Sequence, residues 1–85
     1  MTPFILRFAP QAARQIESLD PVMKGRVATA LESIASDPVI GKPLQGPLKG
    51  LRSHRFGDYR VVYQVFASNR RIDVLKVMHR RDVYR

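Results

Sequence analysis

The chain begins with an alternation of apolar and other side chains that predicts a β-strand. Within residues 3–8 every second side chain falls on the same side of the backbone. The apolar members of one side are Phe4, Leu6 and Phe8. From Pro10 the apolar spacing changes to three and four residues, which predicts an amphipathic helix. Asp20-Pro21 then supplies an N-cap and a first-turn proline, so we expect a second helix from there to about Ser36.

The second half of the chain predicts an antiparallel meander that follows a rigid loop. Three prolines and three glycines between residues 38 and 50 indicate the loop. The three strands of the meander are expected at residues 51–56, 59–66 and 71–77. The two helices would cover one face of the resulting antiparallel sheet. The expected fold is therefore α+β, in a single domain of residues 1–85.

A two-residue turn at Gly57-Asp58 would fix the register of the first hairpin of this meander. Arg55 then lies directly opposite Arg60, while His54 falls on the core side of the sheet. Like charges directly opposite each other destabilise a sheet. The pair therefore indicates a face that holds an anion, unless both guanidinium groups simply extend into water.

The charge of the chain is concentrated in its C-terminal half. The 85 residues carry a formal net charge of +8, although basic and acidic side chains balance within residues 1–41. This asymmetry favours an acidic or polyanionic partner over a purely solubilising surface. The chain contains no Cys, which excludes disulfides, thiolate zinc sites and a cysteine nucleophile. Neither a signal pattern nor a membrane-spanning run is evident, so we expect a cytoplasmic location without membrane attachment.

Candidate catalytic groups lie in the same basic half. The scattered His and Asp residues form no convincing set of metal ligands, and no G-x-S-x-G motif is present. Metal-free RNA cleavage needs a base, an acid and cations that stabilise a dianionic phosphorane. Arginine is a poor proton donor at neutral pH. Proton transfer is thus left to His79 or Tyr84, with Arg60 and Arg80 as electrostatic stabilisers. The tyrosine ring at position 84 could also stack on an unpaired base while the arginines beside it hold phosphates.

Three segments closely resemble RelE-type toxins of bacterial type II toxin–antitoxin modules. They are residues 41–46, the Gly-Asp-Tyr-Arg-Val-Val-Tyr run at 57–63 and the His-Arg-Arg-Asp-Val-Tyr-Arg end at 79–85. The resemblance implies a microbial-ribonuclease-like fold that cleaves messenger RNA on the ribosome without a metal or other cofactor. It also implies a hetero-oligomer with an acidic, partly disordered antitoxin. The related ParE branch poisons DNA gyrase, and a ribosome- or RNA-binding module without cleavage is a further alternative.

The same resemblance implies roles for single residues. Arg60 matches the strand arginine that stabilises the scissile phosphate, and Tyr84 matches the tyrosine linked to activation of the 2′-OH. Arg80 matches the C-terminal arginine, with Arg81 as the other possibility. The remaining candidates, expected to bind RNA, are Lys49, Arg52, Arg55, Arg81 and Arg85. The pattern departs from the family at two strand positions that carry lysine in well-studied members and read Leu51 and Ser53 here.

Overall fold

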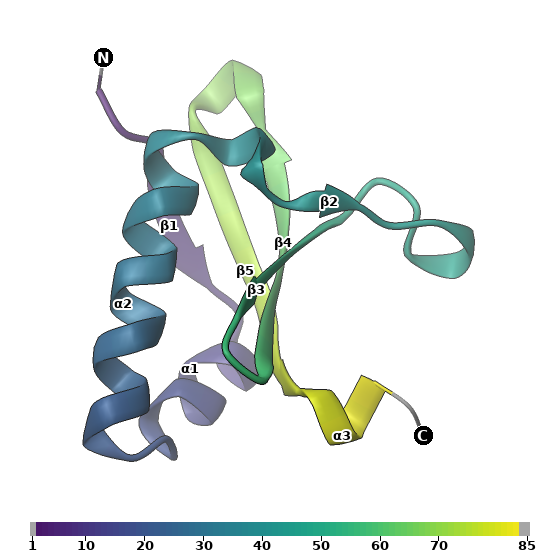
Figure 1. Cartoon of the computed structure of the whole chain (residues 1–85). Helices are drawn as coiled ribbons and strands as arrows, with labels where there is room; N and C mark the ends of the chain where they lie inside the picture. Colours follow the sequence, from purple (N-terminus) through teal and green to yellow (C-terminus); the bar gives the residue numbers. More distant parts are fainter. Residues whose placement is uncertain (1, 84–85) are drawn as a thin grey trace.

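Within the described part of the chain, five strands form one sheet, and the two longer helices pack against one of its faces (Figure 1). The computed structural model describes residues 2–83. The elements are β1 (Ile5–Phe8), α1 (Pro10–Glu17), α2 (Pro21–Ser36), β2 (Lys42–Pro43), β3 (Arg52–Phe56), β4 (Tyr59–Phe66), β5 (Arg71–His79) and α3 (Arg80–Val83). The predicted α+β class is confirmed, and the expected meander corresponds to β3, β4 and β5.

Local signals in the sequence place the ends of α2. The Asp20 carboxylate accepts a hydrogen bond from the Met23 N–H at 2.9 Å, which satisfies one of the free amides of the first turn. At the other end the helix stops at Ser36, one residue before the Asp37-Pro38 pair. Both predicted ends are therefore confirmed.

The sheet is mixed, whereas the sequence predicted an antiparallel one. The strand order is β1-β5-β4-β3-β2, and β1 runs parallel to β5 with Leu6 opposite Ile72. Parallel pairing needs a crossover of a dozen residues or more, which α1 and α2 provide between β1 and the rest of the sheet. A second difference is β2, because this two-residue strand forms inside the segment that was expected to be a loop.

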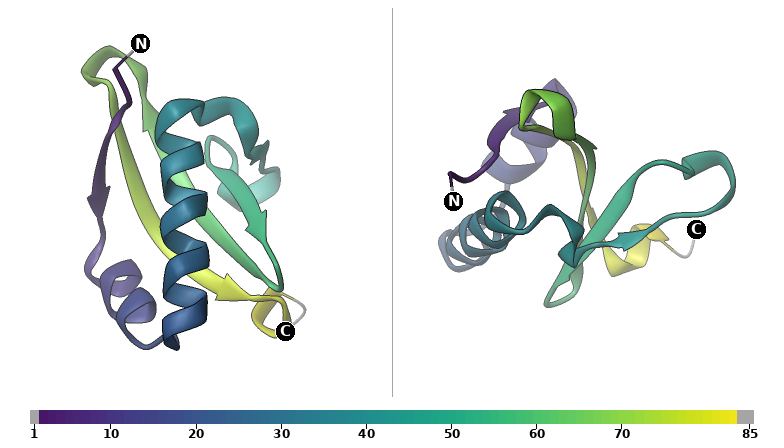
Figure 2. Two further views of the ribbon diagram at one scale, coloured as in Figure 1. Left: turned by 60° about the vertical axis from the view of Figure 1, so that its left-hand side comes forward. Right: turned by 90° about the horizontal axis from the view of Figure 1, so that it is seen from above.

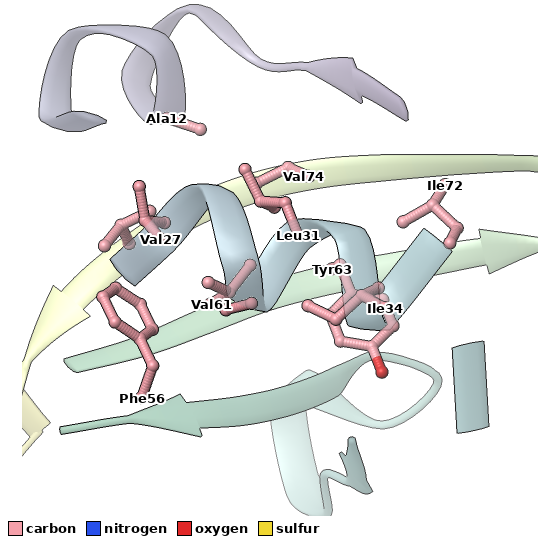
Figure 3. Close-up of a cluster of buried hydrophobic side chains, with 11 residues drawn as sticks. Ala12, Val27, Leu31, Ile34, Phe56, Val61, Tyr63, Ile72 and Val74 are labelled. Atoms are coloured by element: carbon pink, nitrogen blue, oxygen red, sulfur yellow. The ribbon is translucent and has the colours of Figure 1, made fainter. Parts of the chain in front are cut away.

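The hydrophobic core lies between α2 and the face of the sheet that α2 covers. Figure 3 shows apolar side chains of the helix meeting those of the central strands. The largest fully buried side chains are Val27, Ile34, Val61, Tyr63, Ile72 and Val74. On β4 they are the odd-numbered residues Val61 and Tyr63, so the even-numbered residues point to the opposite face.

Tyr63 fastens the segment after α2 to the middle of the sheet. Its hydroxyl donates a hydrogen bond to the Pro38 carbonyl at 2.7 Å and accepts one from the Gly41 N–H at 3.0 Å. Burial raises the pKa of the Tyr63 phenol above its ordinary value of 10.0, so the hydroxyl remains a donor at neutral pH. A Cβ atom at position 41 would clash with this hydroxyl, which explains why glycine stands there.

We predict that Tyr63→Phe lowers the free energy of unfolding by about 1–3 kcal/mol, because the buried Gly41 N–H and the partly buried Pro38 carbonyl lose their shared partner. Urea denaturation monitored by circular dichroism would measure the change. Tyr59→Phe is the matched control, since the Tyr59 hydroxyl makes no hydrogen bond within residues 2–83. Equal stability of wild type and Tyr63→Phe would contradict this role of the hydroxyl.

Candidate nucleic-acid interface

The face of the sheet away from α1 and α2, called the open face here, carries the paired arginines. Arg55 of β3 lies directly opposite Arg60 of β4, and the next pair toward the turn is Phe56 with Tyr59. The predicted hairpin register is therefore confirmed. Phe56 belongs to the core cluster, so strand alternation directs Arg55 and Arg60 toward the open face.

A groove of about 400 Å³ lies on the open face at the edge where β2 meets β3. Its lining includes Lys42 from β2, Ser53 and Arg55 from β3, and Arg60 from β4. We call it the basic groove, because Lys42, Arg55 and Arg60 contribute positive charge to it; its other lining residues are Ile40, Pro43, Leu44, Ser53 and His54. No carboxylate from the described part of the chain lines it. The groove thus has the charge needed to hold an anion such as a phosphate.

Arg80 attaches the start of α3 to the hairpin that carries Arg55 and Arg60. Its backbone N–H donates to the Asp58 carbonyl at 2.6 Å, and its guanidinium lies 3.9 Å from the Asp58 carboxylate. The views from two directions place α3 and the loop after β2 on the side of the sheet away from α1 and α2 (Figures 1 and 2). Arg80 therefore sits at the turn end of the hairpin, with its side chain exposed to solvent.

His79 lies on the opposite face from Arg60. In the β4–β5 pairing His79 is opposite Tyr59, and the two rings meet edge to face with centroids 4.9 Å apart. The His79 Nδ1 atom accepts a hydrogen bond from the Arg81 N–H at 3.1 Å. Strand β5 continues through His79 rather than ending at the predicted residue 77, so its alternation turns this ring toward the helices. The sequence expectation placed His79 in the same site as Arg60. The structure instead puts the two side chains on opposite faces of the sheet.

The residues expected to bind RNA do not form one group. The Arg52 guanidinium donates to the Gly41 carbonyl at 2.7 Å, so this side chain braces the segment before β2. Lys49 and Arg81 are exposed, one in the loop after β2 and the other in α3. Tyr84 and Arg85 lie outside the described residues.

Sequence reasoning missed two lysines of the open face. Lys42 is paired with Ser53, Ser53 with Val62, and Val62 with Lys76, so these residues form one row across four strands. Lys76 could have been found by carrying the alternation of side chains in the hairpin on to β5, where Lys76 lies opposite Val62. Lys42 could not, because nothing in a loop rich in proline and glycine predicts the pairing of β2.

The described residues offer neither a metal site nor a membrane span. No three His, Cys, Asp or Glu side chains among them lie in a group that could hold a metal ion. No helix within the described chain is both long enough and apolar enough to cross a bilayer.

Comparisons with known proteins agree on one family. The model of a family described as the ParE toxin of type II toxin–antitoxin system, parDE, matches residues 6–84. Toxin RelG of Mycobacterium tuberculosis is 34% identical over 85 residues, covering 98% of this chain and 98% of that protein. Toxin RelE of the same organism is 32% identical over 89 residues, covering 98% of this chain and 88% of that protein. In the toxin–antitoxin complex RelBE2 of that organism, a chain superposes with a TM-score of 0.81 at 32% identity, covering 91% of this chain and 98% of that chain.

We predict that Arg55→Gln raises the free energy of unfolding by about 0.2–1 kcal/mol at low ionic strength, because it removes the repulsion from Arg60. The only hydrogen bond lost among the described residues is an exposed one, from the Arg55 Nε to the Gly57 carbonyl at 3.2 Å. The gain should shrink at high salt, where the two charges are screened. Urea denaturation at two salt concentrations would measure both effects, with Arg14→Gln on α1 as the control for loss of an exposed positive charge away from the hairpin. A salt-independent loss of stability in Arg55→Gln would show that the pair is not repulsive.

Proposed function

The chain belongs to the RelE/ParE superfamily of toxins from type II toxin–antitoxin systems, and we propose that it is a ribosome-dependent endoribonuclease that cleaves messenger RNA. The observation that carries this proposal is the basic groove. Arg55 and Arg60 are held side by side on a rigid hairpin, on a face that the core does not use. A fold accepts such a repulsive pair most readily where an anionic ligand separates the two charges.

The proposed reaction is an internal phosphoryl transfer that needs no metal. The 2′-oxygen of a ribose forms a bond to the adjacent phosphorus while the bond from phosphorus to the 5′-oxygen breaks. The products are a 2′,3′-cyclic phosphate and a 5′-hydroxyl; the 2′-OH loses a proton and the leaving oxygen gains one. Negative charge develops on the non-bridging oxygens, where hydrogen bonds from fixed guanidinium groups are most effective.

Arg60 is the principal candidate for this electrostatic role. It is half-buried on the central strand β4, so its position is defined more closely than that of an exposed side chain. Arg80 is the second candidate, because its backbone is tied to the turn of the same hairpin. We retain Tyr84 as the residue that activates the 2′-OH, on the strength of the family resemblance. His79 is not part of the proposal, since its ring lies on the other face.

We further propose that an acidic antitoxin covers the open face and that the two proteins form a hetero-oligomer. Support comes from the solved relative, which is a toxin–antitoxin complex, and from the net charge of +8. A segment that folds on binding can cover a large surface of this kind. The exposed Lys49 and Arg81 would add contacts to phosphates of RNA in the absence of the antitoxin. Because translating ribosomes are the proposed target, the proposed site of action is the cytoplasm.

Arg60→Ala tests the proposed function. We expect it to lower the cleavage rate about 10²- to 10³-fold, the usual cost of removing one donor that stabilises an oxyanion. Primer extension on translated messages after induction would detect the cuts, and circular dichroism would verify the fold. Arg14→Ala on α1 is the matched control, since it removes an exposed arginine from the opposite side of the sheet.

Cuts in phase with codons that disappear in Arg60→Ala but persist in Arg14→Ala would support the proposal. Intact messages together with arrested replication would overturn it in favour of gyrase poisoning. Intact messages, normal replication and stable ribosome binding would instead identify a non-catalytic binding protein.

We also predict that the affinity for the antitoxin falls as salt rises, because an acidic segment must approach the basic open face. Isothermal titration calorimetry at several salt concentrations would measure the dissociation constant. An affinity that does not change with salt would show that apolar contacts alone hold the complex together.

A further inference from the structure

The backbone of Lys42 is anchored at the edge of the basic groove, and its exposed side chain comes from β2, a strand inside the predicted loop. It lines the groove together with Arg55 and Arg60. We propose that Lys42 is a third cation of the phosphate site, and that its ammonium group contacts the non-bridging oxygens of the phosphate bound beside Arg60. This inference rests on the proposed function, because it assigns a residue to that same reaction.

The backbone at Lys42 is anchored on several sides. The preceding residue, Gly41, is buried, and its N–H donates to the Tyr63 hydroxyl while its carbonyl accepts from Arg52. Lys42 itself pairs with Ser53 in the sheet. Two residues further on, the Leu44 N–H donates to the Leu51 carbonyl at 2.9 Å. A lysine held in this way starts from a defined point, so less conformational freedom is lost when its ammonium meets a ligand.

The surroundings of Lys42 leave its charge available to an external anion. In the row across the sheet, its neighbours are Ser53 and Val62, which are 7% and 3% exposed and carry no charge. No acidic side chain among the described residues lines the groove. Arg71, on the same face, is paired with an acidic side chain, unlike Lys42: its Nε atom lies 3.1 Å from an Asp73 carboxylate oxygen. The fold thus neutralises one cation of this face internally and leaves the cations of the groove to a ligand.

The position of Lys42 complements that of the arginines. Arg55 and Arg60 approach the groove from β3 and β4, whereas Lys42 approaches from the edge strand β2. Planar guanidinium groups suit bidentate contact with a phosphate, while an ammonium on a flexible stem acts as a compact point charge. A phosphate bound in the basic groove would therefore meet positive charge from two directions.

Single-turnover cleavage of a message on programmed ribosomes tests this assignment. We expect Lys42→Ser to lower the cleavage rate constant at saturating toxin about 10²-fold. Lys42→Arg should restore most of the rate, because it keeps the positive charge. Lys24→Ser on α2 is the matched control: it makes the same substitution at an exposed lysine on the opposite side of the sheet and should cleave like wild type. Thermal unfolding of each variant would verify the fold.

A charge relocation across the strand pair gives a sharper result. Ser53 lies directly opposite Lys42 on the same face, so a lysine at position 53 can present its ammonium to the same groove. We expect Lys42→Ser combined with Ser53→Lys to recover at least a tenth of the wild-type rate, a gain of about tenfold over Lys42→Ser alone. Position 53 carries lysine in well-studied members of the family, so Ser53→Lys with Lys42 intact is the control and should change the rate by much less than tenfold. A purely structural role of Lys42 would not be restored by a charge on the neighbouring strand, so failure of this rescue, or an equal gain in Ser53→Lys alone, counts against the assignment.

The possible failures are distinguishable. If wild type cleaves and Arg60→Ala does not, while Lys42→Ser cleaves at the wild-type rate, only the role of Lys42 is overturned. If Lys42→Ser weakens ribosome binding but keeps the single-turnover rate at saturation, Lys42 acts away from the scissile phosphate and the assignment is wrong. If wild type itself does not cleave, the proposed function fails, and the role of Lys42 in it fails as well.

Discussion

The tight turn at Gly57-Asp58 is the constraint on which the open face depends. Gly57 has a φ of 58°, a conformation that a hairpin turn of two residues requires and that glycine adopts at little cost. With this turn in place, Arg55 must lie opposite Arg60, and Phe56 must lie on the core side. One residue more or less in the turn would exchange the two faces of the hairpin. The same turn holds the start of α3 through Asp58, so the position of Arg80 depends on it too.

The cations of the open face cost stability that the rest of the molecule must supply. The two ion pairs among the described residues, Arg71–Asp73 and Arg80–Asp58, involve partly or largely exposed side chains and contribute little. The hydrophobic core on the other face supplies the stabilisation instead, through buried residues of α2 and of the strands that it covers. The two faces of one sheet therefore have different roles: one stabilises the fold, and the other presents charge to a ligand.

The parts of the fold that follow from short-range signals could be predicted from sequence. Asp20-Pro21 and the Asp37-Pro38 pair bound α2, and the Gly57-Asp58 turn set the register that brought Arg55 and Arg60 together. Features that depend on long-range packing could not. No local pattern shows that β1 pairs in parallel with β5 or that Lys42 joins the sheet edge. His79 was misplaced for a simpler reason: the strand was expected to end two residues early, which hid the alternation that turns this ring toward Tyr59.

Alternation along β3 also explains why neighbouring arginines serve different purposes. Arg52 lies opposite Tyr63 and, like it, contacts the Gly41 backbone. Arg55, three residues later, lies on the other face and lines the basic groove. The basic composition of this strand therefore cannot be read as one continuous RNA-binding surface. The brace and the groove are nevertheless coupled, because the Gly41 backbone that Arg52 and Tyr63 hold is the point from which Lys42 enters the groove. Loosening that brace is therefore expected to disturb the cation set as well as the stability of the fold.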